Sequence, residues 1–353
     1  MAPTRAAPHL SRRTYLLGLM ALAACRGRER GSPPASEPVA SAEPPTTQAG
    51  PTPTAAVAAA VPAPAVASGG PLPVFYDPHQ HTEANDSFSP SAGKPAKVVA
   101  RWQRSKVPVR LMPVEPVTAE QLALAHSREY VDGVLAGRLP NGFGNTLKEV
   151  AATLPWTTGS LVSAAIHVAQ NGGVAVSPTS GFHHAHYSSG GGFCTFNGLM
   201  VAVRILQSRG LARKIGILDL DMHYGNGTAD ILERLKVADV HHYTFGAHYG
   251  TPEQGEEFIK ELPQILAGFA GCELVLYQAG ADSFVDDPLG GVLTMPQLRM
   301  RDRLVFRHFA AAKTPLVWDL AGGYARDAAG TIEPVLSIHD ATLEECHAAY
   351  AGA

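Results

Sequence analysis

The stretch that decides the fold is residues 217–228, which read ILDLDMHYGNGT. An apolar run, predicted as a strand over 214–220, passes there into acidic residues, a histidine and glycines. This order is typical of a buried parallel strand followed by a loop that carries polar side chains. Asp219, Asp221 and His223 occupy alternate positions, so their side chains share one face of an extended chain. Asp221 and His223 are therefore expected to converge on one cation.

Further apolar runs of the same character predict four more strands, at 173–177, 240–245, 273–278 and 315–320. Helical periodicity occurs over 157–170, which stops before two glycines, and over 196–208. This alternation predicts an α/β fold with a central, mostly parallel sheet that has helices on both faces. Ligands bind beyond the carboxyl ends of the strands in such sheets, so reactive residues are expected there.

A metal site is predicted at these strand ends. Asp282 follows the run at 273–278 and would add a second carboxylate to Asp221 and His223. Three protein ligands leave one coordination position open for water and substrate, as in catalytic zinc sites. Zinc acidifies a water molecule that binds at this open position, and it polarises a carbonyl group. We therefore expect one Zn²⁺ held by these three side chains.

Two adjacent histidines, His183 and His184, follow the run at 173–177. Each has an expected orienting partner on a neighbouring strand end, Asp219 for His183 and Asn226 for His184. A carboxylate raises the pKa of an imidazole more than an amide does, so the two histidines should differ in proton affinity. His184 is predicted to be the general base that takes a proton from the attacking water and delivers it to the leaving amine.

Tyr324 follows Gly322 and Gly323, after the run at 315–320. The glycines leave the backbone free to turn back toward the strand ends. The tyrosine hydroxyl is predicted to donate a hydrogen bond to the oxyanion that forms as the carbonyl becomes tetrahedral.

Together these segments resemble the histone deacetylase and acetylpolyamine amidohydrolase superfamily. The matching stretches, in the family's order, are 181–185, 190–197, 217–228, 280–290 and 322–324. Residues 301–306, RDRLVF, resemble the compact class IV-type branch. The resemblance implies a single arginase/deacetylase-like domain that hydrolyses an N-acyl amide, removing an acetyl or other short acyl group.

The resemblance also implies roles for individual residues. It makes Asp221, His223 and Asp282 the zinc ligands, and it makes His183, His184 and Tyr324, supported by Asp219 and Asn226, the catalytic set. It implies that the Gly192 carbonyl and the Phe193 ring line the acyl channel. It further implies a monovalent cation, K⁺, near Asp219, although His241 and His242 stand where related enzymes usually have a serine that helps to hold it.

An export signal is predicted over residues 1–24. The sequence SRR at 11–13 precedes an apolar run at 15–24, and Cys25 follows directly after this run. This run is too short to span a bilayer, which takes roughly 20 apolar residues, and it resembles a twin-arginine signal with a lipobox. We expect Cys25 to be lipidated, 25–72 to be a Pro/Ala-rich disordered tether, and 73–353 to be the catalytic domain. The predicted location is the bacterial cell envelope, facing the periplasm, with the lipid as the only membrane attachment.

Composition limits the partners. The formal net charge of −3 gives no basic face, so no nucleic-acid partner is expected. The expected substrate is a small N-acylated amine, such as an acetylpolyamine, or an acylated peptide. Two alternatives stay open: an arginase-like ureohydrolase with two manganese ions, and a tethered binding protein with a degenerate active site. The oligomeric state also stays open.

Overall fold

A computed structural model describes residues 70–85 and 87–351. Seven strands form one sheet in the order β2-β1-β3-β7-β6-β4-β5, and all its neighbouring strands are parallel. The strands are β1 (Leu72–Phe75), β2 (Val109–Met112), β3 (Val174–Ser177), β4 (Ile215–Asp219), β5 (Val240–Thr244), β6 (Leu274–Gln278) and β7 (Leu316–Asp319). The predicted single α/β domain with a parallel sheet is confirmed.

Four neighbouring strands in the middle of the sheet have a sequence that is mostly apolar and ends in a polar residue. Every residue of β3, β4, β6 and β7 is buried, as expected for strands covered on both faces. The two strands that sequence analysis missed, β1 and β2, are four residues each. β1 contains Pro73 and β2 contains the exposed Arg110, so neither has the pattern of a strand.

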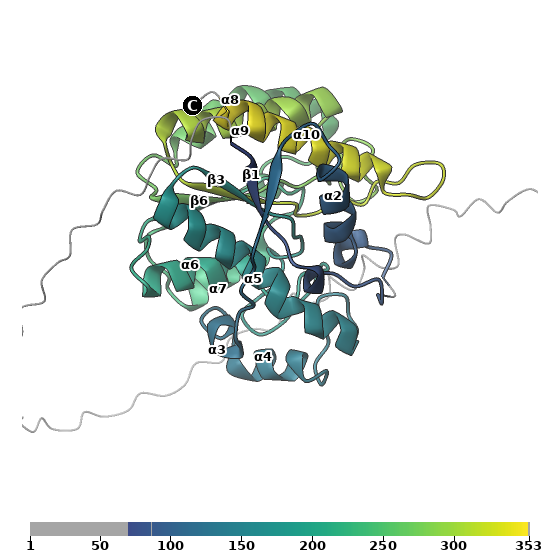
Figure 1. Cartoon of the computed structure of the whole chain (residues 1–353), viewed down its shortest axis with the longest axis vertical. Helices are drawn as coiled ribbons and strands as arrows, with labels where there is room; N and C mark the ends of the chain where they lie inside the picture. The colour runs from purple at the N-terminus through teal and green to yellow at the C-terminus, as the bar shows by residue number, and fades with distance from the viewer. Residues whose placement is uncertain (1–69, 86, 352–353) are drawn as a thin grey trace, which may run out of the picture. The chain divides into compact units, whose positions relative to one another are not determined.

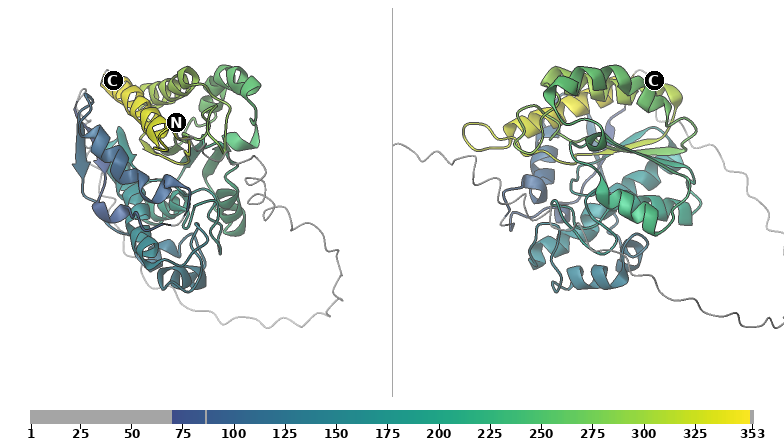
Figure 2. Two further views of the ribbon diagram at one scale, coloured as in Figure 1. Left: turned by 90° about the vertical axis from the view of Figure 1, so that its right-hand side faces the viewer. Right: turned by 180° about the vertical axis from the view of Figure 1, so that it is seen from behind.

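Helices cover both faces of the sheet (Figure 1), and Figure 2 shows the same layers from the side and from behind. One face packs against α2 (Lys94–Trp102), α8 (Gly255–Ala267), α9 (Met295–Ala312) and α10 (Glu333–Tyr350). The other packs against α5 (Lys148–Asn171), α6 (Gly198–Ser208) and α7 (Asn226–Arg234), with α3 (Ala119–Leu122) and α4 (Arg128–Leu135) beside them. Short 3-10 helices are η2 (Pro78–Gln80), η3 (Pro90–Ala92), η4 (Phe245–Ala247) and η5 (Pro252–Gln254).

The two predicted helices are present, and one is longer than expected. The helix predicted at 196–208 corresponds to α6, whereas the one at 157–170 is the second half of α5. α5 contains Pro155, which sequence reasoning treats as a boundary. It ends at Asn171 because Gly172 has φ 71°, a left-handed conformation that favours glycine.

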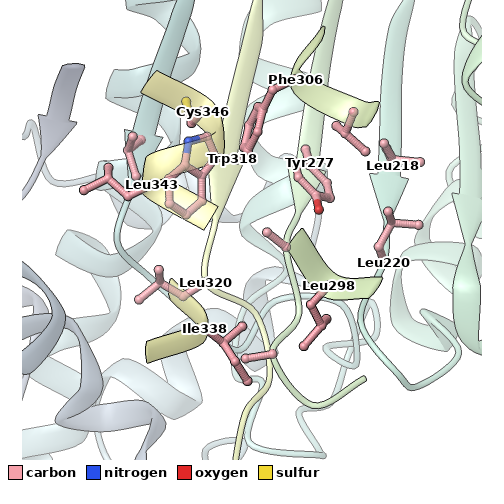
Figure 3. Close-up of a cluster of buried hydrophobic side chains, with 14 of the residues drawn as sticks. Leu218, Leu220, Tyr277, Leu298, Phe306, Trp318, Leu320, Ile338, Leu343 and Cys346 are labelled. Carbon is pink, nitrogen blue, oxygen red and sulfur yellow. The ribbon is translucent and has the colours of Figure 1, made fainter. Parts of the chain in front are cut away.

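One of the two hydrophobic cores joins the sheet to α9 and α10 (Figure 3). The ring of Phe306 on α9 lies 5.7 Å from that of Tyr277 on β6 and 6.0 Å from that of Trp318 on β7. Leu343 and Cys346 on α10 complete this cluster. Because interiors pack at crystal-like density, α9 is held rigidly behind the strand ends that carry the reactive residues.

The predicted signal peptide, Cys25 and nearly all of the predicted tether lie outside the described residues. Among the helices of 70–85 and 87–351, none combines the length and the apolar character that crossing a bilayer requires.

Candidate active site

The segments that follow β3, β4, β6 and β7 meet at one end of the sheet. They bring together the two histidines, the Asp219–His223 segment, Asp282 and Tyr324. The strand order corrects one detail of the prediction, since β7 and β6 lie between β3 and β4. His183 therefore reaches Asp219, and His184 reaches Asn226, because the long loop after β3 crosses the ends of the intervening strands.

The three predicted metal ligands lie together. Asp221, His223 and Asp282 each offer one ligand atom, and these atoms lie within 4.8 Å of one another. His223 Nδ1 is 3.2 Å from Asp221 Oδ1 and 3.1 Å from Asp282 Oδ2. Two carboxylates and one imidazole form a donor set that suits Zn²⁺ and leaves a coordination position free. In the described part of the chain this is the one such group of three.

The local backbone at this site differs from the prediction. β4 ends at Asp219, so Asp221 and His223 do not share the face of an extended strand. They lie in a bend in which the His223 amide donates to Asp221 Oδ1 at 3.0 Å. The side chains converge because the aspartate bonds the backbone two residues on, a frequent feature of turns.

The charges of the site fit a cation. Asp221 and Asp282 are buried, and burial together with the charge of Asp221 raises the pKa of Asp282. Burial lowers the pKa of His223, but the two carboxylates outweigh it and raise that pKa to about 11. The two buried carboxylates repel each other, and a divalent ion bound by the same atoms would neutralise their charge.

The two histidines form the predicted contacts. His183 Nδ1 is 2.8 Å from Asp219 Oδ2, and His184 Nδ1 is 2.8 Å from Asn226 Oδ1. Burial lowers the pKa of His183, but Asp219 and Asp221 outweigh it and raise that pKa to about 9. Burial and the charge of His183 lower the pKa of His184 to about 3. The predicted difference in proton affinity is confirmed in direction.

Tyr324 enters the site through a turn that requires glycine. A Cβ on Gly322 would lie 2.1 Å from Asp282 Oδ2, and Gly323 has φ 146°. The backbone amide of Tyr324 donates to Asp287 Oδ2 at 2.6 Å, which anchors the turn. Burial and the nearby carboxylates raise the pKa of the Tyr324 hydroxyl, so it is a neutral hydrogen-bond donor at ordinary pH.

Gly192 and Phe193 form one wall of the site. Both have positive φ, 54° for Gly192 and 64° for Phe193. A positive φ is uncommon for a bulky residue such as phenylalanine, so it marks a constrained turn. Gly192 lines a small cavity with His183, Asp221 and Tyr324. The ring centroid of Phe193 lies 5.6 Å from that of Tyr324.

Phe88 is a residue at this wall that sequence reasoning missed. Its side chain is 55% exposed, and its ring centroid lies 5.3 Å from that of Phe193 and 5.9 Å from that of Tyr324. Arg326 donates to the Phe88 carbonyl at 3.0 Å and so fixes this loop beside the turn that carries Tyr324. A single aromatic residue in a loop has no periodicity by which the sequence could have identified it.

Two buried polar residues behind the site were also missed. Gln278, the last residue of β6, donates from Nε2 to Asp219 Oδ1 at 2.9 Å and so holds the carboxylate that bonds His183. Lys94 is fully buried, and its Nζ donates to the Ala321 carbonyl at 2.7 Å. Burial lowers the pKa of Lys94 to about 8. The position of Gln278 at a strand end was a usable signal, whereas nothing in the sequence marked Lys94 as buried.

Comparison with known proteins agrees with this layout of an α/β domain whose polar side chains, the candidate reactive groups, lie at the strand ends. A family model described as the histone deacetylase domain matches residues 91–256. An uncharacterized protein of Picosynechococcus sp. is 34% identical over 236 residues, which cover 58% of this chain and 76% of that protein. The acetylpolyamine amidohydrolase of Mycoplana ramosa is 33% identical over 175 residues, 40% of this chain and 49% of the enzyme.

Among solved structures, the acetylpolyamine aminohydrolase of Burkholderia pseudomallei has the same fold. It superposes with a TM-score of 0.61 at 16% identity, over 79% of this chain and 99% of that one. The chain belongs to the histone deacetylase and acetylpolyamine amidohydrolase superfamily. Its fold is the deacetylase-type α/β fold.

Proposed function

We propose that this protein is a zinc-dependent amidohydrolase that removes an acetyl or other short acyl group from an amine, such as an acetylpolyamine or an acyl-lysine. The observation that carries the proposal is the Asp221, His223 and Asp282 set, in which both carboxylates are buried and the ligand atoms lie within 4.8 Å of one another. Beside it lie a histidine pair of unequal basicity and a neutral tyrosine hydroxyl. These are the groups that amide hydrolysis needs: a Lewis acid site, a proton carrier and an oxyanion donor.

Zn²⁺ held by the three side chains would polarise the acyl carbonyl and make a water molecule acidic. His184 acts as the base. Because its Nδ1 faces the Asn226 carbonyl oxygen, Nδ1 carries the hydrogen and Nε2 is left to accept a proton. The low pKa of His184 keeps it neutral before the reaction, and the accepted proton passes to the amine as it leaves.

The hydroxyl of Tyr324 donates a hydrogen bond to the carbonyl oxygen as that oxygen gains negative charge. The Asp287 carboxylate holds the tyrosine backbone in place, so the donor is set before the reaction starts. His183, held by Asp219, supplies a second imidazole beside the ligand Asp221 at 3.5 Å. The Gly192 carbonyl and the rings of Phe193 and Phe88 receive the carbon chain of the amine.

The proposal extends to location and to a second ion. The sequence over 11–25 supports export and lipid attachment at Cys25, which puts small N-acylated amines and acylated peptides of the envelope within reach. A potassium ion near Asp219 is part of the same proposal.

Hydrolysis of acyl amides tests the function. The zinc-loaded full chain is incubated with a fluorogenic acetyl-lysine amide and with an N-acetylated diamine. We expect acetate release that a chelator abolishes, added Zn²⁺ restores, and a hydroxamate inhibits. Protein that binds one Zn²⁺ per chain and cleaves neither compound would support a binding protein instead. Two manganese ions per chain with urea release would support a ureohydrolase.

A further inference from the structure

A buried cation that the proposed mechanism does not use lies behind the two carboxylates of the metal set. Arg301 belongs to the RDRLVF stretch on α9, and its side chain is 0% exposed. A guanidinium stays charged inside a protein, so its burial requires specific partners. Its partners indicate what it does.

The guanidinium binds the backbone on both sides of Asp282. Arg301 Nη1 donates to the Gly280 carbonyl at 2.7 Å and to the Ser283 hydroxyl at 3.1 Å. Asp282 lies between these two residues in the chain, so the guanidinium fixes the loop of Asp282 by one hydrogen bond on each side of the aspartate.

The same nitrogen reaches the loop that carries the other carboxylate. Arg301 Nη1 is 3.5 Å from the carbonyl of Leu220, the residue before Asp221. The two loops also touch directly, because a Cβ on Gly280 would lie 2.5 Å from the Asp221 Cα. One buried nitrogen therefore bridges the two backbone segments that present Asp221 and Asp282.

Arg301 is itself anchored. Its Nε donates to Asp302 Oδ1 at 2.8 Å, and Asp302 also accepts hydrogen bonds from the hydroxyls of Tyr277 and Thr342. Tyr277 lies on β6 and Thr342 on α10, so the guanidinium is tied to the sheet and to a second helix. Figure 3 shows Tyr277 in the hydrophobic cluster that joins β6 to α9 and α10.

We propose that Arg301 is a positioning residue that holds the Leu220–Asp221 and Gly280–Ser283 segments at the separation at which Asp221 and Asp282 share one cation. Without this bridge, two like charges in a buried site would repel each other and the loops would separate. The inference rests on the proposed metal site and adds a residue that touches neither the ion nor the substrate.

Metal binding by Arg301→Gln tests the inference, with Arg303→Gln as the matched control. Arg303 lies two residues further on the same helix, and its side chain pairs with Glu345 on α10 at 2.9 and 3.0 Å. The affinity of the full chain for Zn²⁺ is measured by competition with a chromophoric chelator, and the Co²⁺-loaded protein gives a visible spectrum that reports ligand geometry. We expect R301Q to bind Zn²⁺ about 10- to 100-fold more weakly with an altered Co²⁺ spectrum, and R303Q to match the wild type.

A second pair of variants separates positioning from stability, because R301Q leaves Asp302 buried without its cation. Asp302→Asn keeps the bonds from Arg301 to the loops, so it should lose stability and retain the wild-type affinity for Zn²⁺. The double variant R301Q/D302N removes both buried charges, so it should melt at a higher temperature than R301Q and still bind Zn²⁺ weakly. Wild-type affinity and an unchanged Co²⁺ spectrum in R301Q or the double variant would overturn the inference while leaving the proposed function intact. A wild-type chain that binds no metal would overturn both.

Discussion

Replacing Tyr324 by phenylalanine removes one hydroxyl from the site and little else. The hydroxyl has no hydrogen-bond partner among the residues that the structure describes, and the ring keeps its contacts with Phe193 and Phe88. The backbone stays fixed because Asp287 holds the Tyr324 amide. Stability should therefore change by about 1 kcal/mol or less, because no hydrogen bond is lost and the ring stays packed.

Activity should change much more. Loss of one preorganised oxyanion donor costs about 2.7–4 kcal/mol in the barrier, or about 10²- to 10³-fold in kcat. KM should change little, because the hydroxyl acts on charge that develops only in the transition state. The assay measures kcat and KM on the acetyl-lysine amide, together with zinc content and melting temperature. A variant that keeps its zinc, its melting temperature and the wild-type kcat would refute the oxyanion role.

Three further predictions concern other residues. Asn226→Asp places a carboxylate beside His184 and raises its pKa; since His184 acts in its neutral form, the acidic limb of kcat/KM should move to higher pH, which a pH–rate profile measures. Phe88→Ala should raise KM with little change in kcat or melting temperature, because this ring is largely exposed and packs on Phe193 at the wall of the site. Burial lowers the pKa of His126 to about 4, so the folded state resists its protonation. The contribution of neutral His126 to the free energy of unfolding is complete above pH about 6.5, and about 3 kcal/mol of it should be lost as the pH falls from there to about 4. Urea denaturation over this pH range measures the loss, which should be smaller in His126→Gln.

The parts of the fold that could be predicted are those in which one local signal decides the structure. β4 and β6 are continuous apolar runs because both faces of a central parallel strand are covered, and the residues after such strands had to lie at one end of the sheet. Strand order could not be predicted, because crossover helices let consecutive strands lie apart in the sheet. The contact between His183 and Asp219 therefore rests on a loop that crosses two strands, which no local pattern encodes.

The residues that sequence reasoning missed act through tertiary contacts. Lys94 has no unusual neighbours in the chain, and only the folded structure places its ammonium group against the site. Gln278 stands at a strand end, but its bond to Asp219 on another strand depends on the order of the strands in the sheet. Arg301 was noticed as part of a motif, but charged residues on a helix usually face solvent, and nothing local shows that this one faces inward.

The spacing of the metal set depends on the backbone more than on the packing of its side chains. Gly322 and Gly280 allow their segments to pass so close to Asp282 and Asp221 that a single methyl group would collide with them. Because the segments pass this closely, a small displacement of either loop moves the carboxylate that it carries. The position of each carboxylate is thus set by how the strand-end loops are fixed to one another, which is why a buried cation that bonds both loops can control a metal site that it does not touch.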